Sequence, residues 1–421
     1  MKLFRSKWAA LFFSNFLGVF NDNFVKNCII FIAIGWSMPK WITQSQLISM
    51  VSASLIVPYL FLSPLAGRFA VIYSKKSVFR ISKLFEIPVL VLACVAFNFH
   101  WVMVAVLAVL LMGILSCMYS PSKYSLIRDI GGEHGVSYGS GVFEMMAFLG
   151  ILLGTVTASV VSDHYNQWLI FGIFIGLAIL GYMVTRSIRA HELPENKEEV
   201  GTLNPVRFIR DSYLFAHQHA NVNSAIFGAS VFWMIGGMLQ MNLVIHTKHI
   251  YHASNSITGI VMACAAIGIA LGTWAAGKIS GKDVKTGLIL IGIGGMSIGF
   301  FLITFFQLSL VIFIVLIFFV AFMGGIFQIP CLSMLQNSNL GRKLGDMIGY
   351  LNMLTFIFVL LGTFLFSAIT YFTSENSFVV FGAILVICLF VTIYFHKKSP
   401  EFLIETKKML HFARKNIKRK L

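Results

Sequence analysis

Long apolar stretches constrain the fold of this chain more than any other feature of its sequence. A helix that crosses about 30 Å of hydrocarbon needs roughly 20 apolar residues. Twelve such stretches can be placed, at residues 8–35, 43–66, 79–97, 100–119, 138–162, 167–185, 223–246, 256–277, 286–306, 308–334, 347–371 and 377–395. Only 11% of the 421 residues are charged, and the mean hydropathy is +0.85, which excludes a water-soluble domain of this length. The sequence therefore predicts an all-α membrane protein with twelve transmembrane helices.

Basic residues lie almost entirely on one side of these twelve spans. Of the 32 Lys and Arg residues, all except Lys26, Lys40 and Lys248 fall at the two termini or in connections that follow even-numbered spans. Cytoplasmic connections retain positive charge, so both termini are expected in the cytoplasm of a bacterium, with the chain in the inner membrane. Anionic membrane lipids, rather than nucleic acid, are the expected partners of the net charge of +16.

An internal repeat divides the chain into two halves. Gly67, Pro121 and Gly154 of the first half correspond to Gly277, Pro330 and Gly362 of the second. Two six-helix lobes in parallel order, related by a pseudo-twofold axis along the membrane normal, produce such a repeat in transporters. We expect an N-terminal lobe at 1–190, a cytoplasmic linker at 191–221, a C-terminal lobe at 222–396 and a basic tail at 397–421, the tail being either an amphipathic helix or a solvated segment.

Charged residues inside the spans are the first candidates for a functional site, because a charge in the membrane is costly unless it faces a cavity or a partner. Asp22 and Lys26 are four residues apart in the first span and can pair, and Asn15 continues their helix face. Glu86 lies in the third span and Glu144 in the fifth. Each has a structural alternative: a packing ion pair for the first two, an interfacial position for Glu86, and a bond at the helix end for Glu144.

The repeat also shows what the second half places at the equivalent positions. Asp22 corresponds to Phe232, Lys26 to Gly236, and Glu144 to Asn352. The charges within the membrane therefore belong to one lobe. A cavity between a charged wall and an apolar wall suits an amphiphile with a polar head and a hydrocarbon tail.

No constellation for catalysis, metal binding or cofactor binding is visible. The six cysteines lie singly within apolar stretches, without the spacing of metal ligands. None of the eleven histidines is followed by Asp five positions later, the arrangement that acyltransferases use as a base. We expect a protein that is not an enzyme and that has no cofactor.

Several motifs are similar to those of one known family. They are Leu-Gly-Val-Phe-Asn-Asp-Asn-Phe-Val-Lys-Asn at residues 17–27, Ser-Pro-Leu-Ala-Gly at 63–67, Tyr-Ser-Pro-Ser-Lys-Tyr at 119–124, Gly-Val-Phe-Glu at 141–144, Gly-Lys-Ile-Ser-Gly-Lys at 277–282, and Pro330 with Leu335, Gln336 and Arg342. In these motifs the chain resembles the lysophospholipid transporter branch of the major facilitator superfamily, and the transporter part of its fusions to lysophospholipid acyltransferases. The similarity runs through most of the chain.

The resemblance implies a twelve-helix major facilitator fold that moves lysophosphatidylethanolamine or lysophosphatidylglycerol from the outer to the inner leaflet. Asp22, Lys26 and Glu144 would then line the head-group path, and Lys123 and Arg128 would lie at the cytoplasmic gate. Asn15, Asn23 and Asn352 complete the expected substrate site, and Arg68 and Arg342 the expected gate.

The sequence departs from the family at two points. Val71 stands where an acidic residue is expected after the second span, which puts the usual gate pairing in doubt. No acyltransferase domain follows the tail, so we expect any such enzyme to be a separate chain, with the transporter itself a monomer. The rival interpretations are an exporter or importer of another amphiphile, a drug or a siderophore; a scaffold that delivers substrate to an acyltransferase; and a membrane enzyme.

Overall fold

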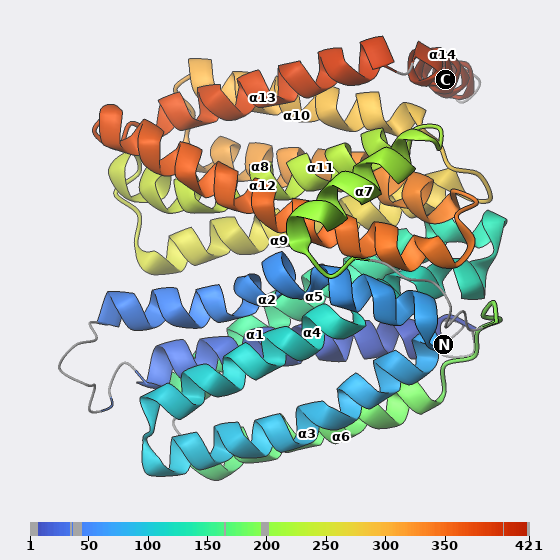
Figure 1. The fold of residues 1–421 in the computed structure, drawn as a ribbon. Coiled ribbons are helices and arrows are strands. Elements are labelled where there is room, and N and C mark those ends of the chain that lie inside the picture. The colour runs from blue at the N-terminus through green and yellow to red at the C-terminus, as the bar shows by residue number, and fades with distance from the viewer. Residues whose placement is uncertain are drawn as a thin grey trace. The chain divides into compact units, whose positions relative to one another are not determined.

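The computed structural model describes residues 7–33, 36, 44–163, 166–194, 202–398 and 400–418 (Figure 1). Each of the twelve predicted spans overlaps one long helix of this part of the chain. These helices are α1 (Ala9–Ala33), α2 (Gln44–Ile72), α3 (Lys75–Phe99), α4 (Val102–Gly131), α5 (Val136–Asp163), α6 (Gln167–Arg186), α8 (Val222–His249), α9 (Asn255–Ser280), α10 (Gly287–Phe305), α11 (Leu310–Asn337), α12 (Leu344–Phe372) and α13 (Ser377–Lys398). Two further helices, α7 (Pro205–His217) and α14 (Pro400–Lys418), are more polar.

Eleven of the described helices are long and apolar enough to cross a membrane. The remaining long helix, α3, is not among them, and it carries Lys83 and Glu86 in its first half. A helix that buries two charges among apolar helices needs a specific partner for each charge. The location of those partners identifies the candidate site described below.

The chain forms two compact units. The first comprises residues 1–132, 146–215 and 339–353, and the second comprises 133–145, 216–338 and 354–421. Helices α5 and α12 therefore contribute residues to both units. The predicted lobe boundaries follow chain order and stay a prediction.

The pattern of neighbouring helices in the first unit is repeated in the second. In the first unit, α4 packs on α2 and α3, while α6 packs on α1 and α3. In the second, α11 packs on α9 and α10, while α13 packs on α8 and α10. Figure 1 shows the corresponding pairs α3 with α6 and α10 with α13 side by side. This agrees with the internal repeat predicted from the sequence.

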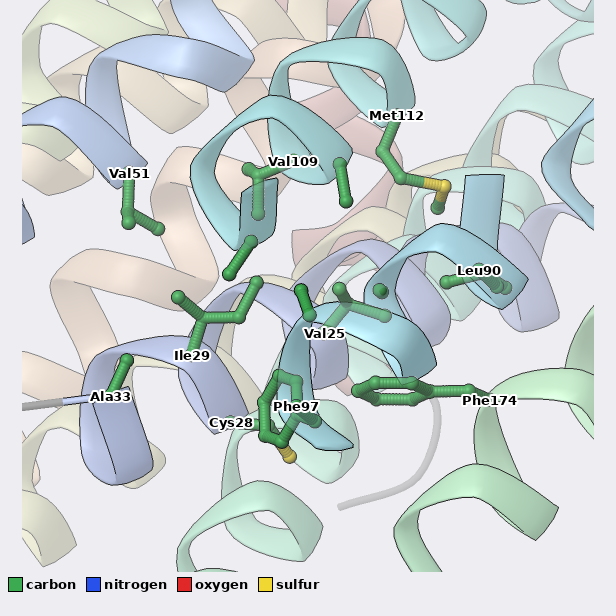
Figure 2. Close-up of a cluster of buried hydrophobic side chains, with 14 of the residues drawn as sticks. Val25, Cys28, Ile29, Ala33, Val51, Leu90, Phe97, Val109, Met112 and Phe174 are labelled. Atoms are coloured by element: carbon green, nitrogen blue, oxygen red, sulfur yellow. The ribbon is translucent and has the colours of Figure 1, made fainter. Parts of the chain in front are cut away.

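A hydrophobic cluster joins the helices of the first unit at one end (Figure 2). It contains Phe24 of α1, Phe97 of α3 and Phe174 of α6, and the Phe174 ring centroid lies 5.5 Å from that of Phe24 and 5.8 Å from that of Phe97. Between helices in lipid, close packing supplies the attraction that burial from water supplies in soluble proteins. The cluster therefore fixes α1 against α3 and α6, next to the polar residues of the site.

Glycines allow two pairs of helices to cross at short distance. In the first unit, a Cβ atom on Gly349 of α12 would lie 2.8 Å from the Ser63 carbonyl oxygen of α2. In the second unit, a Cβ atom on Gly141 of α5 would lie 2.6 Å from the Thr273 carbonyl oxygen of α9. The repeat makes these two crossings equivalent, and small residues are what membrane helices need for such close approach.

Carboxylates cap two equivalent helices. Glu192, which follows α6, accepts the backbone N–H of Lys75 at 2.6 Å, at the start of α3. Glu405 of α14 accepts the backbone N–H of Gly287 at 3.0 Å, at the start of α10. Negative charge is favourable at a helix N-terminus, so each cap ties the segment after the sixth helix of a half to the third helix of the same half.

Residues 400–418 of the tail form a helix, α14, which is one of the two alternatives that the sequence left open; the other was a solvated segment. Phe402 of α14 is buried and stacks on Phe395 of α13, and the Thr406 hydroxyl donates to the Gly287 carbonyl at 3.0 Å. Ile404 and Lys408 are exposed on the other side. One face of α14 is thus bound to its own unit, and Lys407 and Lys408 are exposed.

Candidate functional site

Two polar contacts join α1 to α4. The Ser116 hydroxyl donates to Oδ2 of Asp22 at 2.8 Å, and the Lys123 ammonium donates to Oδ1 of Asn15 at 3.1 Å. The two contacts lie seven residues apart on both helices and run in opposite directions, so α1 and α4 are antiparallel here. The prediction that Asn15 and Asp22 share a face of the first span agrees with this geometry.

A buried ion pair on α3 lies behind this contact. The Lys83 ammonium is 2.5 Å from Oε1 of Glu86, and the two side chains are only 1% and 2% exposed. Gly18 of α1 leaves room for the lysine, because a Cβ atom there would be 2.8 Å from Nζ of Lys83. A buried charge pair is costly to desolvate and persists only with good geometry.

Lys83 was missed by the sequence analysis, which placed it in a connection between spans. It lies instead in the interior of α3, because this helix begins at Lys75 and continues to Phe99. The Glu86 side chain is buried within the protein, and its interfacial alternative stays open. The three-residue spacing of Lys83 and Glu86 within an apolar stretch was the signal available in the sequence.

Tyr119 of α4 brings two lysines together. Nζ of Lys83 lies 4.9 Å from the centroid of the Tyr119 ring, and Nζ of Lys123 lies 5.3 Å from the same centroid. The Phe79 ring stacks on it at 5.0 Å. Cations are attracted to an aromatic ring, more strongly where water is excluded. Tyr119 therefore lowers the cost of holding two ammonium groups in a small apolar volume.

Lys26 has a different hydrogen-bond partner from the one predicted. Its ammonium donates to Oδ1 of Asn23 at 3.3 Å, rather than to Asp22 four residues earlier. The Asn23 side chain donates to the Val19 carbonyl, and Asn27 donates to the Thr155 hydroxyl at 3.0 Å. Asp22 and Lys26 still interact electrostatically, so both belong to one site without forming a direct pair.

We call these residues the buried polar cluster: Asn15, Asp22, Lys26, Lys83, Glu86, Ser116, Tyr119 and Lys123. It contains three lysines and two carboxylates, so it carries an excess of one positive charge when all five groups are ionised. Oδ1 of Asp22 is buried and has no hydrogen-bond partner in the described part of the chain. The cluster can therefore attract an anion while one carboxylate oxygen stays open to a cation.

The two other predicted substrate residues lie in different units. The Asn352 amide donates to the Ser120 hydroxyl at 3.0 Å, which brings it to α4 in the first unit. Glu144 is 1% exposed and belongs to the second unit. The structure thus brings Asn352 to the helix of the buried polar cluster, while Glu144 remains a separate buried carboxylate.

The predicted gate residues lie on helices rather than in connections. Lys123 and Arg128 belong to α4, which continues through Pro121 to Gly131, and Arg68 belongs to the last turns of α2. The expectation that Lys123 and Arg128 follow the span in a connection is therefore wrong. Lys123 is also buried in the polar cluster, whereas Arg128 is half-buried nearer the end of α4.

Arg68 lines a cavity of about 250 Å³ in the first unit. Asp211 of α7, and Lys343 and Asp346 at the start of α12, also line it, and Nζ of Lys343 is 3.4 Å from Oδ2 of Asp346. Equal numbers of positive and negative groups surround this space. The cavity therefore offers no excess of charge that would attract a charged ligand.

Arg342 fixes the connection that follows α2. Its guanidinium donates to the carbonyls of Val71 at 3.1 Å and Tyr73 at 2.8 Å, and also to the Leu193 carbonyl. Nearby, the Lys75 ammonium is 2.7 Å from Oδ2 of Asp129. The absence of an acidic side chain at Val71 is therefore compensated by backbone carbonyls that bind the arginine directly.

Comparisons with known proteins place these features in a family. The model of the Major Facilitator Superfamily matches residues 8–282 and 225–416. Proteins named lysophospholipid transporter LplT from Yersinia enterocolitica and Pectobacterium carotovorum are each 23% identical, over 333 and 334 residues. Each match covers 78% of this chain, and 78% and 77% of the respective relative. The predicted resemblance to lysophospholipid transporters is thereby confirmed.

Solved structures show the same fold. The human organic anion transporter MFSD10 superposes with a TM-score of 0.69 at 14% identity, covering 91% of this chain and 99% of that one. The fucose:proton symporter FucP of Escherichia coli gives a TM-score of 0.73 at 10% identity, covering 92% and 98%. These matches confirm the predicted fold class, and the family model with the names of the relatives confirms the prediction of a transporter rather than an enzyme. This chain belongs to the major facilitator superfamily.

Proposed function

We propose that this protein moves lysophospholipid, chiefly lysophosphatidylethanolamine or lysophosphatidylglycerol, across the bacterial inner membrane by alternating access. The observation that carries the proposal is the buried polar cluster, which holds five ionisable groups among the apolar helices of the first unit. Charges at membrane depth are retained where they serve a substrate path. The name shared by the curated relatives supports a lysophospholipid as the substrate.

The cluster has the groups that a phospholipid head requires. Moving a phosphate and its attached polar group through hydrocarbon removes their hydration, at a cost that only hydrogen bonds and opposite charges can offset. Lys26 and Lys123 supply positive charge for the phosphate, and Asp22 supplies negative charge for a cationic head. Asn15 and Asn23 add hydrogen-bonding groups on the same helix. The acyl chain needs none of these and can remain against apolar residues or lipid.

The remaining predicted residues are proposed to act around this centre. Glu144 and Asn352 would contact the substrate in one of the alternating states, and Arg68, Arg128 and Arg342 would stabilise the closed cytoplasmic end. Substrate then shifts the equilibrium between states through its unequal affinity for them. This division assigns binding to the buried polar cluster and closure to the helix ends.

Orientation and partners complete the proposal. The distribution of basic residues supports a cytoplasmic location for both termini, and the exposed Lys407 and Lys408 of α14 fit the anionic headgroups of that leaflet. The protein would act as a monomer and deliver its product to a separate acyltransferase. Fusing a reporter that is active only in the cytoplasm to the C-terminus tests the orientation, and a fusion protein that reaches the membrane but gives no signal would contradict it.

A transport assay tests the proposed function. Purified protein in liposomes is given labelled lysophosphatidylethanolamine in the outer leaflet, and the label that becomes protected from extraction is followed with time. We expect protection with the wild type, and a large loss with Asp22→Asn or Lys26→Met. Asp283→Asn, which changes an exposed carboxylate after α9, is the matched control and should behave as the wild type. Folded, inserted wild-type protein that protects neither lysolipid would refute the proposal.

A further inference from the structure

The Asp22 carboxylate is satisfied on one side only. Oδ2 accepts the Ser116 hydroxyl at 2.8 Å, whereas Oδ1 is buried and accepts no hydrogen bond from any described residue. A buried polar atom without a partner is rare in native proteins, because it loses its hydration and gains nothing in return. Oδ1 of Asp22 can therefore accept a hydrogen bond from a ligand that enters among the three lysines.

Lys83 lies close to Asp22 on the neighbouring helix. A Cβ atom on Gly18, four residues before Asp22 on α1, would be 2.8 Å from Nζ of Lys83. The Lys83 ammonium is bound instead to Glu86 at 2.5 Å, in a pair that is almost fully buried. Glu86 follows Lys83 by three residues on α3, so the helix itself holds the two side chains together. The structure thus keeps this cation on Glu86 rather than on Asp22.

We propose that Glu86 is a positioning residue that holds Lys83 off Asp22, so that Oδ1 of Asp22 binds the primary ammonium of an aminated lipid head group. The inference rests on the proposed function and adds a preference to it. Asp22 would favour a zwitterionic head that carries an ammonium over a head of the same size that carries only hydroxyls.

The composition of the cluster favours a zwitterion over a simple inorganic cation. An ammonium at Asp22 uses the open oxygen, and the phosphate attached to it places its negative charge among the lysines that remain, Lys26 and Lys123. Both charges of the head group are then matched. A lone metal cation would only add to the excess of positive charge of the cluster.

Substrate preference in four proteins provides the test. Transport of lysophosphatidylethanolamine and lysophosphatidylglycerol with the same acyl chain is measured in proteoliposomes, and the ratio of their kcat/KM values is compared. The proteins are the wild type, Glu86→Gln, Glu86→Gln combined with Lys83→Met, and Asp129→Asn. Asp129→Asn is the matched control. It breaks the buried ion pair between Lys75, at the start of α3, and Asp129 of α4.

In Glu86→Gln, the released Lys83 should occupy Asp22 and lower the ethanolamine-to-glycerol ratio about tenfold or more, the effect of a lost charge-assisted contact. Removing Lys83 as well should restore the ratio, although one more group of the cluster has been changed. Asp129→Asn should leave the ratio unchanged. If Glu86→Gln does not fold, the double variant still decides, because it should keep the wild-type preference.

Three results would overturn the inference. The first is an equal fall in kcat/KM for both lipids in Glu86→Gln, which is expected if the Lys83–Glu86 pair serves only to stabilise the fold. The second is a double variant that stays as unselective as Glu86→Gln. The third is binding that depends on sodium equally for both lipids, which would assign Oδ1 to an inorganic cation. A wild type that moves neither lipid would instead remove the proposed function, and this inference with it.

Discussion

Removing Lys83 alone should destabilise the protein far more than removing Lys83 and Glu86 together. The pair is 2.5 Å apart with side chains 1% and 2% exposed, so Lys83→Met leaves a buried carboxylate without its cation. Breaking a buried pair in this way costs about 3–5 kcal/mol. Replacing both partners, by Lys83→Met with Glu86→Gln, leaves no uncompensated charge and should cost at most about 1–2 kcal/mol. The expected coupling energy is therefore at least about 1–3 kcal/mol.

The free energy of unfolding is measured for each variant by SDS titration in mixed micelles, with helix content followed by circular dichroism. Lys75→Met provides the comparison, because Lys75 of α3 and Asp129 of α4 form a second buried pair, 2.7 Å apart. Lys75→Met should lower the free energy of unfolding by an amount similar to Lys83→Met. A double variant at Lys83 and Glu86 that is as unstable as Lys83→Met would refute the account of this pair as a mutually neutralised unit.

Four other substitutions test a helix crossing, the cap of α10 and the contacts of Arg342. Gly272→Ala brings a Cβ atom into the backbone of α11 and should destabilise the protein by about 1–3 kcal/mol, whereas Gly259→Ala on the same helix meets no atom within 4 Å and should be neutral or slightly stabilising in the same thermal melt. Glu405→Ala removes the cap of α10 and should cost about 1 kcal/mol, with faster amide hydrogen exchange confined to the first turn of α10. Arg342→Met removes the donor to three backbone carbonyls and should speed exchange at residues 71–76 without changing that at 286–289.

The architecture was predictable because hydrophobic length and charge placement act locally. Each span could be placed from its own run of apolar residues, and the repeat could be read from Gly67 and Gly277 without any contact information. The same two glycines prove to be the crossing points of helices that approach closely in each unit. Helix ends were less predictable, since α4 continues past Pro121 for ten residues that carry Lys123 and Arg128.

The site was only partly predictable, because its geometry depends on which helices are neighbours. Asp22 and Lys26 stood out as charges within a span, and Asn15 followed from helical periodicity. That Lys83 would reach Tyr119 could not be read from the sequence, since the contact depends on the packing of α3 against α4 and on the space left by Gly18. The direct pairing of Asp22 with Lys26 was wrong, because Lys26 donates to Asn23, whereas Asp22 accepts from Ser116 of α4.

Photo-crosslinking of the substrate gives the most direct test of the central claim, that the head group passes through the buried polar cluster. A lysophosphatidylethanolamine with a photoreactive group on its head is bound to the reconstituted protein, irradiated, and located by mass spectrometry of the peptides. We predict adducts on residues 15–26 of α1 and 116–124 of α4, reduced by excess unlabelled lysolipid and by Asp22→Asn. Competable adducts confined to other helices, in protein that transports the lipid, would contradict the account.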